Sequence, residues 1–451
     1  MTGSKSGSLT VSLALSMLIF LTFCLVLTEG VRFYFLKANA AQAMELAEFS
    51  VLSEYQQELL SEYGVFFLDL DYEQGTEQMS VLKQRLGHYL SQNTEETETA
   101  GLEAKEFQRA TDQGGLPFFA QAVESMKVKT GYKLFEELTG ITEGLETESV
   151  DLGKLLEENT EEANTLLGQY VDEEGVPLFQ ISLPNVSFPS INALTEAVFG
   201  SESMLSDKSV DLKERLLYRS LSVGNGTKEK TGLAEMQLFH GYLFEHFYHY
   251  GAKKPQILRN ALEYQLEYII SGGGSDRKNL ENIMWRIFLL RASGNYLLYH
   301  QDGEQMAKAE AEATALAGIT GNAAVIRVVK EILLISQAIE DGIEETKSIF
   351  AGEKVPLCKN GILSSIEMGY EQYLYFFLST TDQTKKIYRS MDIVELEVRK
   401  KSGYEKFRLD HCTDRFTVEW TWQAESIFEK LPFLEGGVYE NTIRRKLFYE
   451  M

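Results

Sequence analysis

The stretch LTVSLALSMLIFLTFCLVL, residues 9–27, contains no charged residue, no proline and no glycine. An α-helix rises about 1.5 Å per residue, so this stretch covers roughly 28 Å, close to the hydrocarbon thickness of a bilayer. We therefore predict a transmembrane helix over residues 8–28, preceded by a short tail of residues 1–7. The remaining chain is expected on one side of the membrane.

Two other interpretations of this stretch remain open. A secretion signal has a shorter apolar core and a nearby small-residue cleavage site. Here the best such site, residues 38–40, lies well beyond the core, and Glu29, Arg32 and Lys37 intervene. An uncleaved anchor is therefore the preferred prediction, with a cleaved signal and a buried helix of a soluble protein as the alternatives.

The orientation of the anchor is predicted from its short N-terminal tail. Lys5 lies before the apolar segment, and Arg32 and Lys37 lie after it, so the positive-inside rule barely discriminates. A short tail before a first apolar segment usually stays in the cytoplasm. We expect a single-pass protein of the cell membrane, with a cytoplasmic N-terminus and the bulk of the chain extracytoplasmic.

The composition is that of a globular chain with an acidic surface. Its 451 residues are 44% hydrophobic and 24% charged, with a formal net charge of −24. Such a charge argues against a nucleic-acid partner. The cysteines are Cys24, Cys358 and Cys412. Cys358 and Cys412 are candidates for one disulfide if the domain is exported, and two unrelated buried thiols are the alternative.

Good helix formers continue beyond the apolar stretch. Residues 31–62 are rich in Ala, Glu, Gln and Leu, which predicts one helical rod that ends at Tyr63 and Gly64. Small residues let another element approach closely, either from the same chain or from a neighbouring subunit. We expect the packing face of this helix to contain small residues, with Glu29 and Arg32 at the membrane interface. The candidates on this face are Ala38, Ala40, Ala43 and Ala47.

Periodicity predicts the elements that follow. The acidic residues 143–175 and the three prolines after them mark the best candidate domain boundary. We predict a buried strand over 65–70, a helix over 76–93, a surface loop over 94–115 and a helix over 117–139. Helical spacing also recurs over 233–250, 256–271, 276–301, 304–317 and 321–350, which predicts a helical bundle.

The C-terminal part changes to strand-like alternation. The segments MDIVELEVR (391–399), YEKFRLDH (404–411) and FTVEWTWQA (416–424) alternate apolar and polar residues, which predicts a three-stranded antiparallel meander. The strand at 65–70 is a candidate for the same sheet. The fold class is thus α+β, mostly helical, with a transmembrane helix extended into a long rod, an exported bundle and a small antiparallel sheet. The predicted domains beyond the anchor are 29–142, 143–205, 206–355 and 356–451.

The histidines cluster without the spacing of a metal site. His240, His246 and His249 lie near Glu245, but the spacing matches neither HExxH nor HxxEH. The pattern favours aromatic-rich helix packing, and a metal site is the lesser alternative.

Two further segments resemble ligand-binding motifs only in part. Asp69, Asp71 and Glu73 begin like a calcium loop, but Gln74 and Ser80 occupy the positions that require Gly and Glu. The glycine-rich segment 271–275 lacks the GK[ST] of a phosphate-binding loop and predicts a turn between helices. No catalytic arrangement is evident, so we expect no enzyme, no cofactor and no small-molecule substrate.

The N-terminal sequence resembles that of a known group. The segments KSGSLTVSLALSMLIFLTF (5–23) and EGVRFYFLKANAAQAMELAEFSVLSEYQQELLSEYGVFFLD (29–69) are similar to an uncharacterised Firmicutes family of membrane-anchored, extracytoplasmic proteins. Residues 117–132, 262–280 and 391–423 also look like blocks of this family. Members are often encoded beside tight-adherence (Tad/Flp) pilus genes, and their N-termini resemble minor pilin-like proteins of that machinery.

The resemblance implies a processing site and a role. In such pilins a peptidase cuts after a glycine, and the matching bond here is Gly7–Ser8; Ser12 stands where they usually carry Glu. The expected function is a pilin-like accessory role in a Tad/Flp-type pilus or related secretion machinery. Its expected partners are the bilayer and either pilus proteins or further copies of itself. The alternatives are a static envelope anchor outside any filament and, remotely, an exported metal-dependent enzyme.

Overall fold

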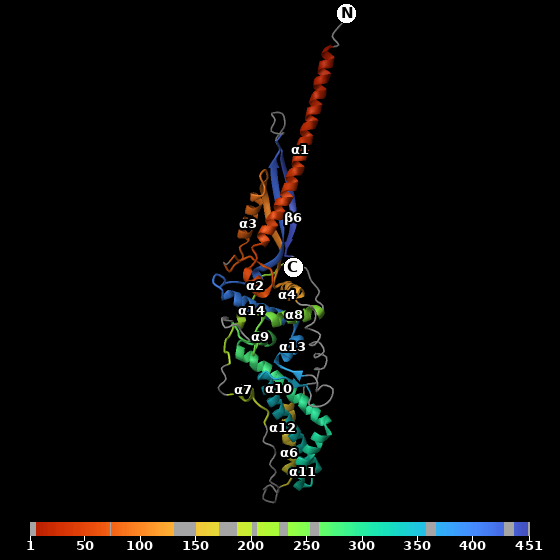
Figure 1. The fold of residues 1–451 in the computed structure, drawn as a ribbon, viewed down its shortest axis with the longest axis vertical. Helices are drawn as coiled ribbons and strands as arrows, with labels where there is room; N and C mark the ends of the chain where they lie inside the picture. The colour runs from red at the N-terminus through yellow and green to blue at the C-terminus, as the bar shows by residue number, and fades with distance from the viewer. Residues whose placement is uncertain are drawn as a thin grey trace. The chain divides into compact units, whose positions relative to one another are not determined.

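The computed structural model describes residues 6–72, 74–129, 150–170, 187–200, 205–224, 233–252, 261–357, 367–427 and 437–449. The fold is α+β and mostly helical, as predicted (Figure 1). The chain divides into two compact units. The first comprises Met1–Ser125, Ser220–Gly232 and Val394–Met451, and the second comprises Met126–Arg219 and Leu233–Ile393. The first unit is assembled from three separate parts of the chain.

The first unit is built on helix α1 (Ser6–Leu52), which corresponds to roughly 70 Å of helix. Within the described residues, α1 is the one helix long and apolar enough to cross a membrane, and its apolar window is not buried inside the chain. A signal sequence near the N-terminus meets the same criteria of length and composition. The rod is shorter than predicted, because a turn separates α1 from α2 (Gln57–Tyr63). Gly64 ends α2 as predicted, in the left-handed conformation that glycine adopts without strain.

The sheet of the first unit is antiparallel and centred on β5 (Cys412–Glu425). One edge of β5 pairs with β2 (Glu98–Arg109), and the other pairs with β6 (Val438–Phe448) and with β1 (Leu68–Asp69). The predicted strand at 416–424 is therefore confirmed. The strand at 65–70 also joins this sheet, although only two of its residues pair.

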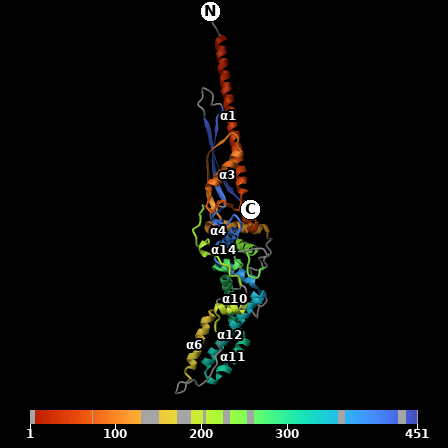
Figure 2. The same cartoon turned by 90° about the vertical axis from the view of Figure 1, so that its left-hand side faces the viewer.

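One face of β5 forms the core of the first unit. Phe416, Val418, Trp420 and Trp422 share this face and are buried, as their alternation predicts. Helix α1 and helix α3 (Met79–Gln92) cover this face, as Figures 1 and 2 show. From α1 the cluster receives Leu36, Ala40, Ala43, Met44, Ala47 and Val51.

Two predictions for this part of the chain are wrong. The predicted surface loop 94–115 contains strand β2, whose side chains are mostly exposed or half-buried, so that it resembled a loop. The predicted strand 391–399 belongs to helix α14 (Gln383–Arg399). Ile387, Met391, Val394 and Val398 are all buried. Their spacing fits a helical period, so the short alternation within 391–399 was misleading.

The segment 404–411 is not a strand either. It forms turns and the short 3₁₀ helix η5 (Leu409–His411). The helix predicted over 117–139 is confirmed as α4 (Asp112–Lys129) up to its described end. The acidic excursion includes helix α6 (Leu152–Leu167), and residues 171–175 lie outside the described part.

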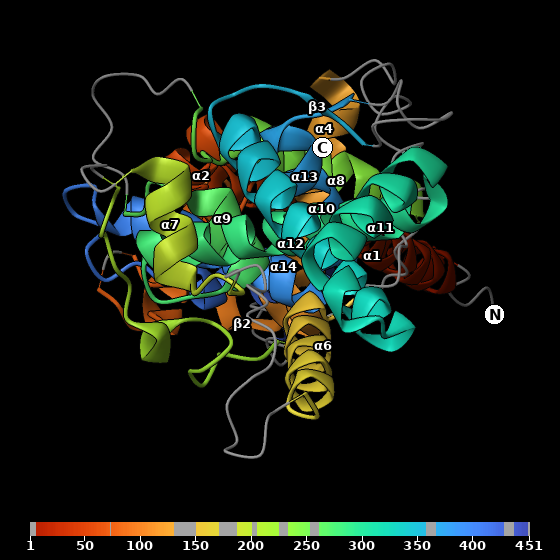
Figure 3. The ribbon, with the colours of Figure 1, turned by 90° about the horizontal axis from the view of Figure 1, so that it is seen from below.

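The second unit is helical, as predicted. Helix α10 (Asp276–Gln301) packs along α12 (Ala323–Phe350), as Figure 3 shows. A Cβ at Gly342 would lie 2.9 Å from the Cβ of Ala292, so glycine allows this close contact. The remaining described elements of the unit include α7 (Ile191–Phe199), η2 (Leu212–Glu214), α8 (Leu233–His246), α9 (Gln265–Ser271), α11 (Gly303–Ala317), η3 (Gly318–Thr320), β3 (Val355–Pro356), β4 (Glu367–Met368) and α13 (Tyr370–Thr380).

The packing of α1 on the sheet leads to a stability prediction. In Ala47→Glu, a charge would enter a position with no solvent exposure, which should cost at least about 3 kcal/mol of unfolding free energy. Ala41→Glu places the same side chain on the exposed face of α1 and should change stability by less than about 0.5 kcal/mol. Denaturation of the full chain in detergent, followed by tryptophan fluorescence, tests this. Equal losses in the two variants would contradict it.

Candidate functional site

The alanines predicted to form the packing face of α1 differ in their burial. Ala40, Ala43 and Ala47 are buried and contribute to the core on the tryptophan face of β5. Ala38 is exposed. Of the two alternatives, close packing within the same chain therefore describes three of the four alanines. The Gly7–Ser8 bond lies in the first turns of α1.

The exposed face of α1 beyond the apolar stretch carries five apolar residues, with the exposed Gln42 among them. We call Val31, Phe35, Ala38, Leu46 and Phe49 the outward stripe. All five are exposed, and Val31 and Phe49 have 71% and 65% of their surface accessible. Val31 and Phe49 are 18 residues apart, which is five helical turns, so they point in the same direction. No described part of the chain covers this stripe.

The end of the sheet nearest the apolar stretch of α1 is attached to this helix through five residues. We call Glu29, Arg32, Glu96, Glu425 and Ile427 the hairpin junction. The guanidinium of Arg32 donates to the carbonyl oxygen of Glu425 at 2.9 Å, and lies 3.0 Å from the carboxylate of Glu96. The backbone N–H of Ile427 donates to the Glu29 carboxylate at 3.3 Å. The last described residues that follow β5 are thus fixed to α1 just beyond its apolar stretch.

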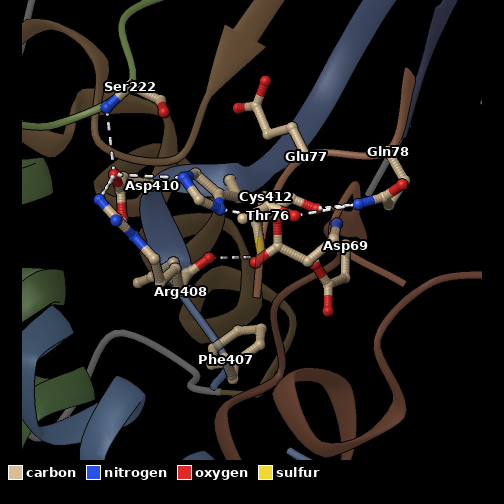
Figure 4. A network of polar contacts seen from close by, with 12 residues as sticks. Asp69, Thr76, Glu77, Gln78, Ser222, Phe407, Arg408, Asp410 and Cys412 are labelled. Carbon is tan, nitrogen blue, oxygen red and sulfur yellow. Dashed lines mark hydrogen bonds and ion pairs between the residues drawn. The ribbon is translucent and has the colours of Figure 1, made fainter. Parts of the chain in front are cut away.

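A buried polar network lies at the opposite end of β5. The carboxylate of Asp410 accepts hydrogen bonds from two nitrogens of Arg408, at 2.7 and 3.1 Å, and from the backbone N–H of Ser222 at 3.1 Å (Figure 4). Beside it, Nδ1 of His411 lies 2.6 Å from the carboxylate of Asp71. Asp410 and Asp71 are almost fully buried. The network therefore joins segments that are far apart in the sequence.

A thiol lies in the same region. The thiol of Cys412 donates to the carbonyl oxygen of Arg408 at 3.6 Å. Burial, with the nearby carboxylates Asp69 and Asp71, raises the pKa of Cys412 well above its ordinary value, so the reactive thiolate is disfavoured.

Two sequence-based predictions, the candidate disulfide and the calcium-like segment, concern this region. Cys412 has a free, buried thiol, whereas its candidate partner Cys358 lies outside the described residues. In the segment that begins like a calcium loop, the Asp69 carboxylate accepts from the N–H of Asp71 at 2.9 Å. Glu73 lies outside the described part. Asp71 is bonded to His411, so these two carboxylates are engaged within the protein.

Each of the clustered histidines in the second unit contacts a different partner. Nε2 of His240 lies 2.8 Å from Nζ of Lys386, the ring of His246 packs on Tyr242, and Nδ1 of His249 lies 2.7 Å from the carbonyl oxygen of Tyr250. The expected aromatic packing is present. Within the described ranges, no group of three or more His, Cys, Asp or Glu side chains could hold a metal ion.

A cavity of about 310 Å³ in the second unit is lined by His249, Tyr250, Phe350 and Tyr370, among others. Next to it, the fully buried Glu267 accepts from the hydroxyl of Tyr370 at 2.6 Å and from the N–H of Tyr250 at 2.7 Å. Burial raises the pKa of Glu267, and these hydrogen bonds oppose the rise. The carboxyl group therefore supports the backbone and aromatic walls of the cavity.

Sequence reasoning missed His411, Arg408 and Glu96 as partners. His411 and Asp71 are separated by 340 positions, and no local pattern indicates such a pair. Arg32 was predicted at the membrane interface, but its role in holding the hairpin depends on the register of β5, which composition does not give.

Comparison with known proteins identifies a family for this chain. A model of DUF5702, described as a family of unknown function, matches residues 185–362 and 364–424, more than half of the chain. The match covers most of the second unit and nearly all of β5, and α1 lies outside it. Neither the curated proteins nor the solved structures contain a match to this chain.

The Lys386–His240 pair leads to a pH prediction. Burial lowers the pKa of Lys386 to about 8 and that of His240 to about 3, with Asp382 partly opposing the shift of Lys386. Between pH 8 and 10.5 the unfolded chain holds more protons on this lysine than the folded chain does. Stability should therefore rise with pH in this window, by up to about 1.4 kcal/mol per pH unit.

Lys386→Met should remove that rise, whereas Lys385→Met, at the exposed neighbouring position, should retain it. Thermal unfolding of the full chain, followed by circular dichroism across this window, makes the comparison. The same pH slope in wild type and Lys386→Met would contradict the assignment.

Proposed function

Because this chain belongs to DUF5702, a family of unknown function, we propose a function from its structure and its N-terminal sequence. The protein is a membrane-anchored, pilin-like accessory component of a Tad/Flp-type pilus or related secretion machinery. It acts through protein–protein contact and not through catalysis. Its short N-terminal tail lies in the cytoplasm and the bulk of the chain lies outside the membrane.

The observation that carries the proposal is the division of α1 into three surfaces. Residues 9–27 are apolar and have almost no protein around them. Beyond them, one face of the helix is buried on β5, and the opposite face presents the outward stripe. A pilin-like subunit needs these same surfaces, because its helix must sit in the bilayer, carry its own globular part and pack against neighbours.

The exposed outward stripe supports a protein partner. Scattered apolar residues are common on protein surfaces, but these five follow one side of a single helix over 18 residues. Their size and alignment suit an amphipathic or apolar helix packed alongside α1. The resemblance of residues 5–23 and 29–69 to Tad-associated proteins identifies pilus components as the partners to test.

A static envelope anchor is the second candidate. Ser12 favours it, since pilins that enter filaments usually carry Glu at this distance from the cut. In that case the outward stripe would contact a fixed envelope partner, and the N-terminus would not be processed.

The N-terminus of the mature protein distinguishes these two candidates. For a processed pilin-like protein we expect a chain that starts at Ser8, with residues 1–7 removed. Intact mass and N-terminal sequencing of protein isolated from native membranes give the answer. A chain that starts at Met1 or Thr2 would support the static anchor, and one that starts at Ala41 would mean secretion.

The outward stripe can be tested without disturbing the core. Phe49→Glu should weaken co-purification with pilus proteins more than about tenfold, because a charge would enter an apolar contact. Ile319→Glu is the matched control, as Ile319 is 70% exposed but lies in the second unit. Both variants should keep the circular dichroism of the wild type. Unchanged co-purification of folded Phe49→Glu would contradict the proposal.

A further inference from the structure

The position of the hairpin junction along α1 places part of the sheet near the bilayer. The apolar run ends at Leu27, and Glu29, which bonds the N–H of Ile427, follows two residues later. At 1.5 Å per residue this is roughly 3 Å along the helix axis. The headgroup region extends roughly 5–7 Å beyond the hydrocarbon on each side. Ile427 therefore lies at headgroup level when α1 spans the membrane.

Tilting of α1 does not remove Ile427 from this region. Transmembrane helices tilt by about 20° on average. A strand packed beside the helix lies roughly 10 Å from its axis, so such a tilt changes its depth by only about 3 Å. The end of the hairpin then moves between the edge of the hydrocarbon and the outer headgroups.

Two apolar side chains are exposed at this end of the described part of the hairpin. Ile427 is 52% exposed, and Val438, which opens β6 opposite Glu425, is 61% exposed.

The polar groups nearby are arranged to hold the hairpin against α1. Arg32 satisfies the carbonyl oxygen of Glu425 and pairs with Glu96, and Glu29 is buried. A cavity of about 560 Å³ at this junction is lined by Arg32, residues 95–98 and residues 423–427, with Val438. Ile427 and Val438 line this cavity together with Glu95, Glu96, Glu98 and Glu425, so the exposed apolar side chains stand beside acidic ones.

We propose that Ile427 and Val438 form a second membrane contact, which inserts at the boundary between the headgroups and the acyl chains. The partner is the lipid bilayer itself. The sheet of the first unit then rests directly on the membrane, with β5 rising away from it. The inference rests on the membrane span of α1 in the proposed function, but it does not depend on a pilus role.

A photocrosslinking experiment on the full chain tests this contact. The photoreactive residue benzoylphenylalanine would replace one residue at a time in protein reconstituted into vesicles of phosphatidylethanolamine and phosphatidylglycerol in equal amounts. After irradiation, intact mass reveals a covalent phospholipid adduct. We expect an adduct at Ile427 and at Val438.

Two control positions separate the contact from the anchor. Val223 is 84% exposed in the same unit, and its neighbour Ser222 bonds Asp410 beside the start of β5. That end of the strand is roughly 40 Å from the hairpin end, so no adduct is expected. Phe20 lies within the apolar run of α1 and should give an adduct whenever α1 spans the bilayer.

The outcomes are distinct. No adduct at Phe20 would refute the membrane span and with it the inference. An adduct at Phe20 with none at Ile427 or Val438, or crosslinks there to protein only, would overturn the membrane contact and leave the anchor intact. Arg32→Ala should reduce the adduct yield at Ile427 at least about threefold while Phe20 keeps its yield. An unchanged yield at Ile427 would contradict the role of the hairpin junction.

Discussion

The close contact between the alanines of α1 and the tryptophan face of β5 is the constraint on which the first unit depends. Ala40, Ala43 and Ala47 leave the helix backbone near the sheet, and the large rings of Trp420 and Trp422 fill the space between them. A larger side chain at these positions would push the helix away from the sheet. Within the described part of the chain, the N-terminal part of the same helix has no such partner, so one continuous helix joins an exposed apolar stretch to a protein core.

The sequence predicts those elements in which local pattern and final environment agree. The alternation in 416–424 predicted the strand correctly because one face of β5 is covered and the other is more open. Strand β2 was missed because only a few of its side chains are buried, and its pairing with β5 is a backbone interaction that composition does not reveal. The short alternation of 391–399 fits two periods, and only the longer series from Ile387 to Val398 distinguishes helix from strand.

The candidate sites were predictable to a similar extent. The sequence indicates that small residues on α1 face a close neighbour, but whether that neighbour is a sheet or another subunit depends on tertiary structure. The pairing of Asp71 with His411, and of Arg32 with Glu425, joins residues that are hundreds of positions apart. Such pairs follow from the register of β5. Without that register, Asp71 resembles a calcium ligand and His411 has no evident role.

The buried polar groups and the exposed apolar groups of the first unit serve different purposes. Arg408 is bonded to Asp410, and His411 to Asp71, so these pairs connect segments of the protein. The outward stripe and the hairpin end remain uncovered by any described part of the chain, and they lie on different sides of α1. A helix in a membrane can rotate about its own axis. A hairpin that rests on the bilayer on one side of α1 limits the tilt of the helix toward that side. The outward stripe then faces away from the sheet, in a direction parallel to the membrane surface. A second membrane-anchored helix would approach α1 from that direction.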